Sequence, residues 1–261
     1  MASIHLDNSS QLGNKMLNKV PQITLYFWII KILCTTVGET GADLLNENLK
    51  LGLTKTSIIM SVLLIIILIF QFRSNKYVPS IYWLAVVFLS VVGTLITDNL
   101  TDNLGISLQV TTIVFAIALA ITFIIWYVNE KTLSIHKIDT TKREAFYWLA
   151  ILFTFALGTA SGDLLAESLK LGYLLSAVIF AVAIALIFLA YKILHLNAVL
   201  AFWLAYILTR PLGASIGDYL SQDTKDGGLG LGTVITSVIF LVAILITVIY
   251  LTRTKKDVID S

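Results

Sequence analysis

The segment 27–43 reads FWIIKILCTTVGETGAD, and related segments follow at 82–98 (YWLAVVFLSVVGTLITD), 147–163 (YWLAILFTFALGTASGD) and 202–218 (FWLAYILTRPLGASIGD). In each copy a Trp is followed ten residues later by Gly and fifteen residues later by Asp. The Asp-to-Asp intervals are 55, 65 and 55 residues, which indicates that a pair of units was duplicated. Periodicity of this size is typical of one supersecondary unit used several times.

The composition predicts an all-α polytopic membrane protein. Hydrophobic residues make up 57% of the chain and charged residues 13%, about half of the roughly 25% usual in soluble domains. An apolar stretch of about 20 residues crosses a bilayer as a helix, because a helix satisfies its own backbone polar groups. The chain has eight such stretches, at 21–42, 54–72, 79–97, 107–128, 144–162, 173–191, 198–217 and 231–252.

Each repeat therefore contributes two transmembrane helices, a helical hairpin. The predicted repeats, 21–73, 77–128, 142–192 and 197–252, form one membrane domain at 21–252, between cytoplasmic segments at 1–20 and 253–261. Almost all ionisable residues inside the spans fall in the odd-numbered ones, and such residues are costly in lipid. We expect odd helices inside, even helices outside, and pseudo-fourfold or nested twofold symmetry along the membrane normal. The repeated glycines would allow close helix contact, and the tryptophans would be packing or interface anchors.

Charge distribution predicts the orientation. With the N-terminus in the cytoplasm, twelve basic residues lie on the inner side and four on the outer side. Such a bias is typical of cytoplasmic loops, so both termini are expected inside. Residues 1–20 show no signal-peptide pattern. The basic residues are spread over the inner loops, which argues against a nucleic-acid partner, and the oligomeric state stays open.

Polar residues follow each odd-numbered span in steps of four, and residues four apart share a helix face. We call the four residues that each repeat contributes in this way a row. Each row has an Asp in its third position, and this position lies near the outer edge of the hydrocarbon core. In chain order the rows are Thr35, Glu39, Asp43, Glu47; Ser90, Thr94, Asp98, Asp102; Phe155, Thr159, Asp163, Glu167; and Arg210, Ala214, Asp218, Gln222.

Converging carboxylates and hydroxyls are the ligands that hard cations such as Mg²⁺, Ca²⁺ and Mn²⁺ prefer. The predicted metal ligands are the four repeated aspartates, and further oxygen groups would bind or conduct the cation. Alternatively these acids are solvated helix ends, or the helices break at the repeated glycines and restart. Cys34 is alone, and the histidines lack ligand spacing, which argues against haem and zinc sites. The candidate metal ligands are Asp43, Asp98, Asp163 and Asp218. The further candidates for cation binding or permeation are Glu39, Glu47, Asp102, Glu167, Thr94 and Thr159.

Two basic residues lie inside the predicted spans. Arg210 precedes Pro211 and lies in the same row as Asp218, two steps of four before it, and in a closed ring of helices it would neighbour Glu39. We expect an Arg210–Glu39 pair, which either fixes the register of the ring or acts as a gating counter-charge, and a kink at Pro211. Lys31 is expected to extend its amine toward the cytoplasmic face.

Three short segments carry a family resemblance. They are REAFYW at 143–148, GTASGD at 158–163 and TRPLGA at 209–214. They resemble a family of bacterial membrane-anchored proteins with four tandem two-span repeats of unknown function and a characteristic Trp in each repeat. The resemblance covers about residues 20–252 and implies the bacterial cytoplasmic (inner) membrane, but no activity or site.

The favoured function is a transporter or channel for an inorganic cation, with a divalent metal considered first. The expected partners are the lipid bilayer and that cation, with no other cofactor. Alternatives are a non-catalytic membrane scaffold or a small-solute binder. An enzyme is not expected, although the Gly-Asp pairs at Asp163 and Asp218 are similar to those of intramembrane aspartyl proteases. The spacing of Asp98 and Asp102 is similar to that of enzymes that bind Mg²⁺-pyrophosphate.

Overall fold

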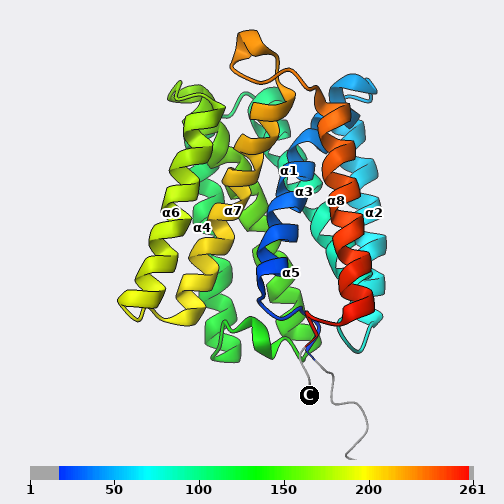
Figure 1. Ribbon diagram of the computed structural model, residues 1–261, viewed down its shortest axis with the longest axis vertical. Helices are drawn as coiled ribbons and strands as arrows, with labels where there is room; N and C mark the ends of the chain where they lie inside the picture. Colours follow the sequence, from blue (N-terminus) through cyan, green and yellow to red (C-terminus); the bar gives the residue numbers. More distant parts are fainter. Residues whose placement is uncertain (1–17, 259–261) are drawn as a thin grey trace, which may run out of the picture.

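The computed structural model describes residues 18–258, apart from the Glu47 side chain. Over this range the chain is entirely helical, with eight long helices and no strand (Figure 1). The long helices are α1 (Leu25–Asp43), α2 (Leu53–Arg73), α3 (Pro79–Asp98), α4 (Leu108–Glu130), α5 (Thr141–Asp163), α6 (Tyr173–Ile193), α7 (Ala198–Ser221) and α8 (Thr233–Thr254).

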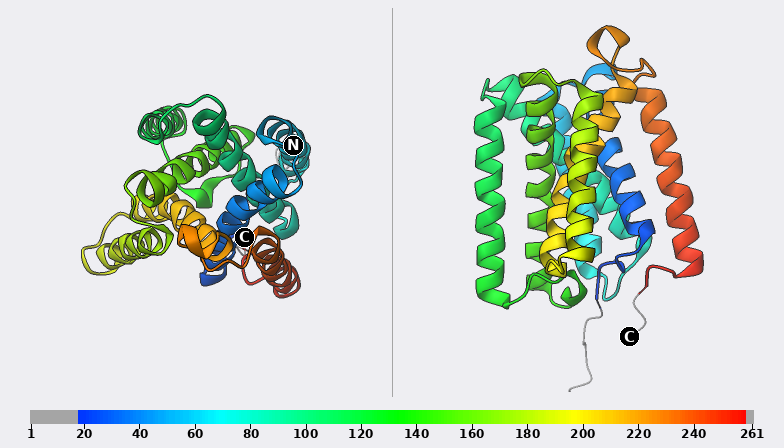
Figure 2. Two further views of the ribbon diagram at one scale, coloured as in Figure 1. Left: turned by 90° about the horizontal axis from the view of Figure 1, so that it is seen from above. Right: turned by 60° about the vertical axis from the view of Figure 1, so that its left-hand side comes forward.

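The odd helices form the interior and the even helices the periphery, as predicted. Helix α1 contacts α3, α3 contacts α5, α5 contacts α7, and α7 returns to α1, so that these four make a closed inner bundle. Each even helix lies mainly against one inner helix: α2 on α3, α4 on α5, α6 on α7 and α8 on α1 (Figure 2). The even helices leave long rows of Ile, Leu and Val exposed, as suits contact with lipid.

Seven of the long helices described are apolar and long enough to cross a membrane: α2 to α8. The remaining one, α1, carries Lys31 and Glu39 in the middle of its apolar sequence. Both side chains are buried, because α3, α7 and α8 surround α1. The polar residues that lower the hydropathy of α1 are therefore kept away from the lipid-facing surface.

Local sequence explains where the helices begin. Thr24, Ser107 and Thr140 each accept a hydrogen bond from a backbone N–H in the first turn of the helix that follows. Glycines with positive φ, including Gly52 and Gly172, precede even helices and allow the sharp turn from the inner to the outer helix.

The odd helices do not break at the repeated glycines, so the alternative of broken and restarted helices is wrong. Helices α1, α3 and α5 continue to the repeated Asp and then widen into a π-helical turn, at Leu44–Asn48, Asn99–Asn103 and Leu164–Ser168. Helix α7 instead continues to Ser221, and a loop with a short 3-10 helix at Thr224–Asp226 leads to α8. Such π-helical turns are frequent at functional sites.

The repeated glycines form the contacts that close the inner bundle. A Cβ added at any of the four would overlap the residue three positions before the glycine of the next inner helix. Only a residue without a side chain permits these inner helices to approach so closely. The four contacts are Gly38 with Ser90, Gly93 with Phe155, Gly158 with Arg210 and Gly213 with Thr35.

Candidate cation site

Arg210 links all four inner helices at the centre of the bundle. From α7, its Nη1 donates to the Thr35 carbonyl of α1 at 2.9 Å. Its Nη2 donates to Thr159 Oγ1 of α5 at 2.7 Å and to Thr94 Oγ1 of α3. The side chain is fully buried, and its Nε has no hydrogen-bond partner among the described residues. The guanidinium is thus fixed in position by one helix of each repeat.

The predicted contact between Arg210 and Glu39 is present. Arg210 Nη2 lies 2.7 Å from Glu39 Oε2, and both side chains are buried. Glu39 of α1 therefore neutralises Arg210 of α7 at the contact between the first and the last inner helix. Whether this pair gates a pathway is a separate matter of function.

Glu39 also belongs to a group of three carboxylates. Glu39, Asp163 and Asp218 each place one oxygen so that all three lie within 4.8 Å of one another. Glu39 and Asp218 are 6% and 7% exposed, whereas Asp163 is half-buried, so the group is shielded on one side and accessible on the other. Within residues 18–258 the ion pair of this group is the one with Arg210, so three ionised carboxylates would leave two negative charges without a paired cation. Oxygen ligands with this charge fit a hard divalent cation.

The other two repeated aspartates lie close by without joining that group. Asp98 and Asp43, like the group itself, are at the end of the bundle away from the described termini. Asp98 interacts electrostatically with Glu39, Asp43 and Asp163, and Asp218 interacts with Asp43 as well. The structure thus brings two of the four aspartates together with Glu39 and leaves the other two as a nearby source of negative potential.

Two of the three acids predicted above the Asp level lie at the surface. Asp102 and Glu167 are exposed in the π-helical turns, and the Glu47 side chain lies outside those that the structure describes. Glu167 accepts a hydrogen bond from the Tyr173 hydroxyl at 3.5 Å and interacts electrostatically with Glu39. These residues make an acidic approach to the buried group, which would attract cations.

Thr94 and Thr159, the two threonines of the predicted site, are fully buried beneath the carboxylates. Each hydroxyl donates to a carbonyl of its own helix, that of Ser90 or Phe155, at 3.2 Å. The same hydroxyls accept from Arg210, so their present role is to hold the guanidinium rather than to ligate a cation.

Lys31 does not extend to the cytoplasmic face, and that prediction is wrong. The residue is 0% exposed, because rings from α5 and α7 cover it. Its Nζ lies 4.0 Å from the centroid of Phe155 and 4.2 Å from that of Tyr206. No hydrogen bond to Nζ forms among the described residues, so the two π faces are the contacts that replace water.

An aromatic layer lies beyond Lys31, toward the end of the bundle that carries the described termini. It consists of the residue before each repeated Trp: Phe27, Tyr82, Tyr147 and Phe202. The ring centroids of Phe27 and Phe202 are 5.9 Å apart, and the two tyrosine hydroxyls are hydrogen-bonded to each other. All four side chains are buried, and Phe202 also lines the lateral cavity between α6, α7 and α1. The sequence does show these aromatic residues in register, but it does not show the ring contact between α1 and α7 or the hydroxyl contact between α3 and α5.

A buried ion pair lies at the same end as the aromatic layer. Lys19 Nζ is 2.6 Å from Glu144 Oε2 and donates to the Phe72 carbonyl at 3.0 Å. Gln71 donates to the other oxygen of Glu144 at 3.0 Å. The segment before α1 is thereby fastened to α2 and α5.

Four segments of the chain match one family model, which is described as Repeat of Unknown Function (DUF347). The matched residues are 26–77, 81–132, 146–195 and 201–257. This finding confirms four tandem repeats of unknown function. No curated protein and no solved structure matches the chain.

Proposed function

The chain belongs to the DUF347 family of repeats of unknown function, and we propose that it transports an inorganic cation, with a divalent metal ion as the substrate. The observation that carries this proposal is the group of three carboxylates, Glu39, Asp163 and Asp218, with ligand atoms within 4.8 Å of one another inside a membrane-compatible bundle. Like charges this close repel one another strongly at low dielectric, so a bound cation would stabilise them.

The charges favour a divalent ion over a monovalent one. Arg210 offsets one of the three carboxylates, which leaves a charge deficit that one M²⁺ ion would fill. The oxygen-only ligands favour Mg²⁺, Ca²⁺ or Mn²⁺ over metals that prefer thiolate or imidazole. Two further aspartates, Asp43 and Asp98, add to the negative potential at the site.

The proposed membrane arrangement has eight spans, including α1, and an approximate fourfold axis along the membrane normal. The four glycine contacts support this symmetry, because the same two repeat positions meet at each of them. The excess of basic residues supports placing both termini in the cytoplasm of a bacterial cell with the protein in its inner membrane. The carboxylates would then lie near the outer face.

A carrier fits the interior better than an open channel does. Acidic residues lead to the site from the outer end, whereas Arg210, Lys31 and the aromatic layer fill the axis on the inner side. Passage to the cytoplasm therefore requires the inner helices to move. The structure would correspond to a state in which the site is reached from outside and closed inside.

One observation favours a second function, an intramembrane aspartyl hydrolase. Oxygens of Asp163 and Asp218 lie within 4.8 Å of each other, as two carboxylates that share a water would. The third carboxylate and the adjacent Arg210 argue for the cation site instead, because a pair that acts as acid and base needs one shared proton and no additional charges.

Reconstituted protein would test the proposal directly. Proteoliposomes containing a Mn²⁺-sensitive dye should show uptake with the wild-type protein and none above background with Asp163→Asn or Asp218→Asn. Asp223→Asn is the matched control, since Asp223 is exposed in the loop before α8 and forms an ion pair with the exposed Lys225. Wild-type uptake by both site variants, or equal loss in the control, would reject the cation site.

A further inference from the structure

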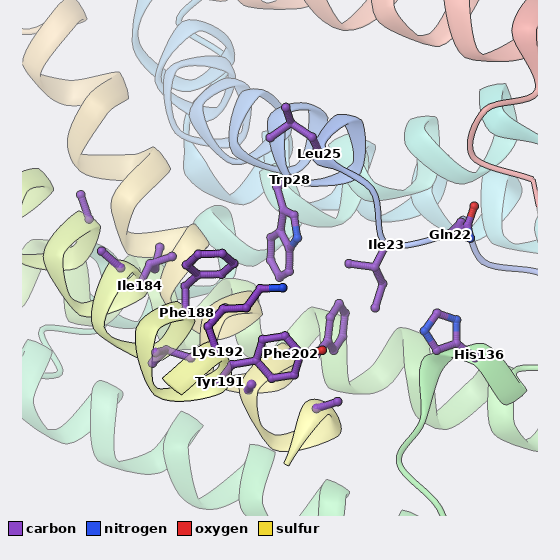
Figure 3. Close-up of a pocket in the computed structure, with 16 residues that line it drawn as sticks. Gln22, Ile23, Leu25, Trp28, His136, Ile184, Phe188, Tyr191, Lys192 and Phe202 are labelled. Atoms are coloured by element: carbon purple, nitrogen blue, oxygen red, sulfur yellow. The ribbon is translucent and has the colours of Figure 1, made fainter. Parts of the chain in front are cut away.

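A large cavity opens on the outer surface of the bundle, away from the carboxylates. It lies between α6, α7 and the beginning of α1 and has a volume of about 820 Å³. Small residues of α7, Ala198, Ala201 and Ala205, line it. Trp28 and Phe188 line it as well (Figure 3). Cavities of a few hundred to about 1,000 Å³ with mostly apolar walls are typical of sites for small molecules.

The corresponding crevices of the first two repeats are filled. Positions 71, 126 and 191 each follow the start of a matched repeat segment by 45 residues. Trp126 is 0% exposed and lies against Trp203, with ring centroids 5.8 Å apart. Gln71 is 1% exposed and bonds to Glu144. Tyr191, by contrast, is 39% exposed and lines the open cavity, so the third repeat leaves open a space that the first two repeats fill.

The cavity has an apolar part that faces lipid and a polar end. The adjoining surface of α6 exposes Leu186, Phe188 and Leu189, as expected of a helix in contact with acyl chains. Lys192, from the last turn of α6, extends its amine toward the space between Trp28 and Phe202 (Figure 3).

The polar end also carries Gln22 and His136, which lie together at one side of the cavity (Figure 3). Lys192 contacts the rings of Phe188 and Tyr191, and none of the ion pairs found between residues 18 and 258 includes it. An ammonium group without an acidic partner can bind an anionic lipid head group, and the apolar cavity beside it can hold a hydrocarbon chain of the same lipid.

We propose that this cavity binds one anionic phospholipid from the leaflet on the side of the chain termini. One acyl chain occupies the groove over Ala201 and Ala205, and the phosphate lies against Lys192, with Gln22 and His136 as hydrogen-bonding neighbours. Basic pockets between transmembrane helices recognise lipid head groups in this way, and the anionic charge supplies the selectivity. Because the site is separate from the carboxylates, it does not depend on the proposed transport.

Native mass spectrometry of the full-length protein in detergent tests the site, with phosphatidylglycerol and phosphatidylcholine of matched chains as probes. Wild-type protein should bind one phosphatidylglycerol about fivefold more tightly than phosphatidylcholine, the order of preference that one lysine supplies. Lys192→Gln should bring the two affinities together. Lys76→Gln, which changes an exposed lysine in the loop between α2 and α3, should retain the preference.

A second variant tests the contribution of the apolar groove to lipid binding separately from that of the Lys192 charge. Ala205→Phe adds a ring to the groove and should weaken binding of both lipids while the melting temperature shows that the protein remains folded. The proposal is overturned if wild-type protein binds the two lipids equally, if Lys192→Gln keeps the preference, or if folded Ala205→Phe binds phosphatidylglycerol like wild type.

Discussion

Replacing Arg210 by Gln removes the cation that holds the four inner helices together. The variant loses hydrogen bonds to Thr35 O at 2.9 Å, to Thr159 Oγ1 at 2.7 Å and to Thr94, and it leaves Glu39 without its partner at 2.7 Å. Breaking a buried pair by removing one partner costs about 3–5 kcal/mol of unfolding free energy, largely because the remaining charge is uncompensated.

Adding Glu39→Gln removes that remaining charge but restores none of the bonds to the threonines. The double variant should therefore be more stable than the sum of the single changes predicts, by about 0.5–3 kcal/mol, the range measured for residues in one hydrogen-bond network. The measurement is reversible unfolding of all four proteins in mixed micelles, with Mn²⁺ uptake followed in parallel.

The exposed pair Asp223–Lys225 provides the matched control. Its atoms are 3.4 Å apart and its side chains are 69% and 76% exposed, so its coupling should not exceed about 0.5 kcal/mol. Additive effects of the Arg210 and Glu39 changes would refute the idea that the two charges compensate each other. Coupling of the same size in the exposed pair would show that the measurement does not report on burial.

Three further results are expected. Gly213→Ala should destabilise the protein by about 1–3 kcal/mol in the same unfolding measurement, because its Cβ overlaps α1, whereas Gly41→Ala, with its nearest neighbour atom at 3.7 Å, should be tolerated. Phe202→Ala, which opens the aromatic layer, should let proteoliposomes leak Mn²⁺, and an unchanged passive rate would show that the layer is no barrier. Burial raises the pKa of Asp257 despite its hydrogen bond from Tyr77, so the folded state holds this proton more tightly than the unfolded state does. The resulting stabilisation is complete below the unfolded pKa of about 4 and is lost as pH rises through the folded pKa, and Asp257→Asn should flatten this dependence.

The repeat pattern predicted the architecture because each part of it has a direct physical reason. Polar residues in alternate spans cannot face lipid, which places those helices inside, and glycines in register mark where they touch. The contact between Arg210 and Glu39 followed from the same reasoning, since the first and fourth repeats must be neighbours in a closed bundle.

The composition of the carboxylate group did not follow from the pattern. A step of four residues turns about 40° beyond a full helical turn, so Glu39 and Asp43 cannot both point along the same direction toward the axis. Which of them faces Asp163 and Asp218 depends on the rotation of α1 about its own axis, and the packing against its neighbours sets that rotation.

Other features depended on contacts between distant parts of the chain. Lys19 and Glu144 are 125 residues apart, and nothing in either local sequence indicates the other. Lys31 was expected to reach water because a long flexible amine usually can. The rings of Phe155 and Tyr206 prevent this, and they come from two other repeats.

The layer that contains Arg210 explains why the four repeats belong to a single polypeptide. At this level the repeats contribute Thr35, Ser90, Phe155 and Arg210, and each touches a glycine of its neighbour. Four identical subunits would place either four guanidinium groups or none around the axis, and four would repel one another. One cation that bonds to four different residues on three other helices requires copies that have diverged in sequence while keeping the same backbone contacts. Fusion of the four copies in one gene allows each copy to change independently. A homotetramer of one hairpin could not have evolved a single central arginine.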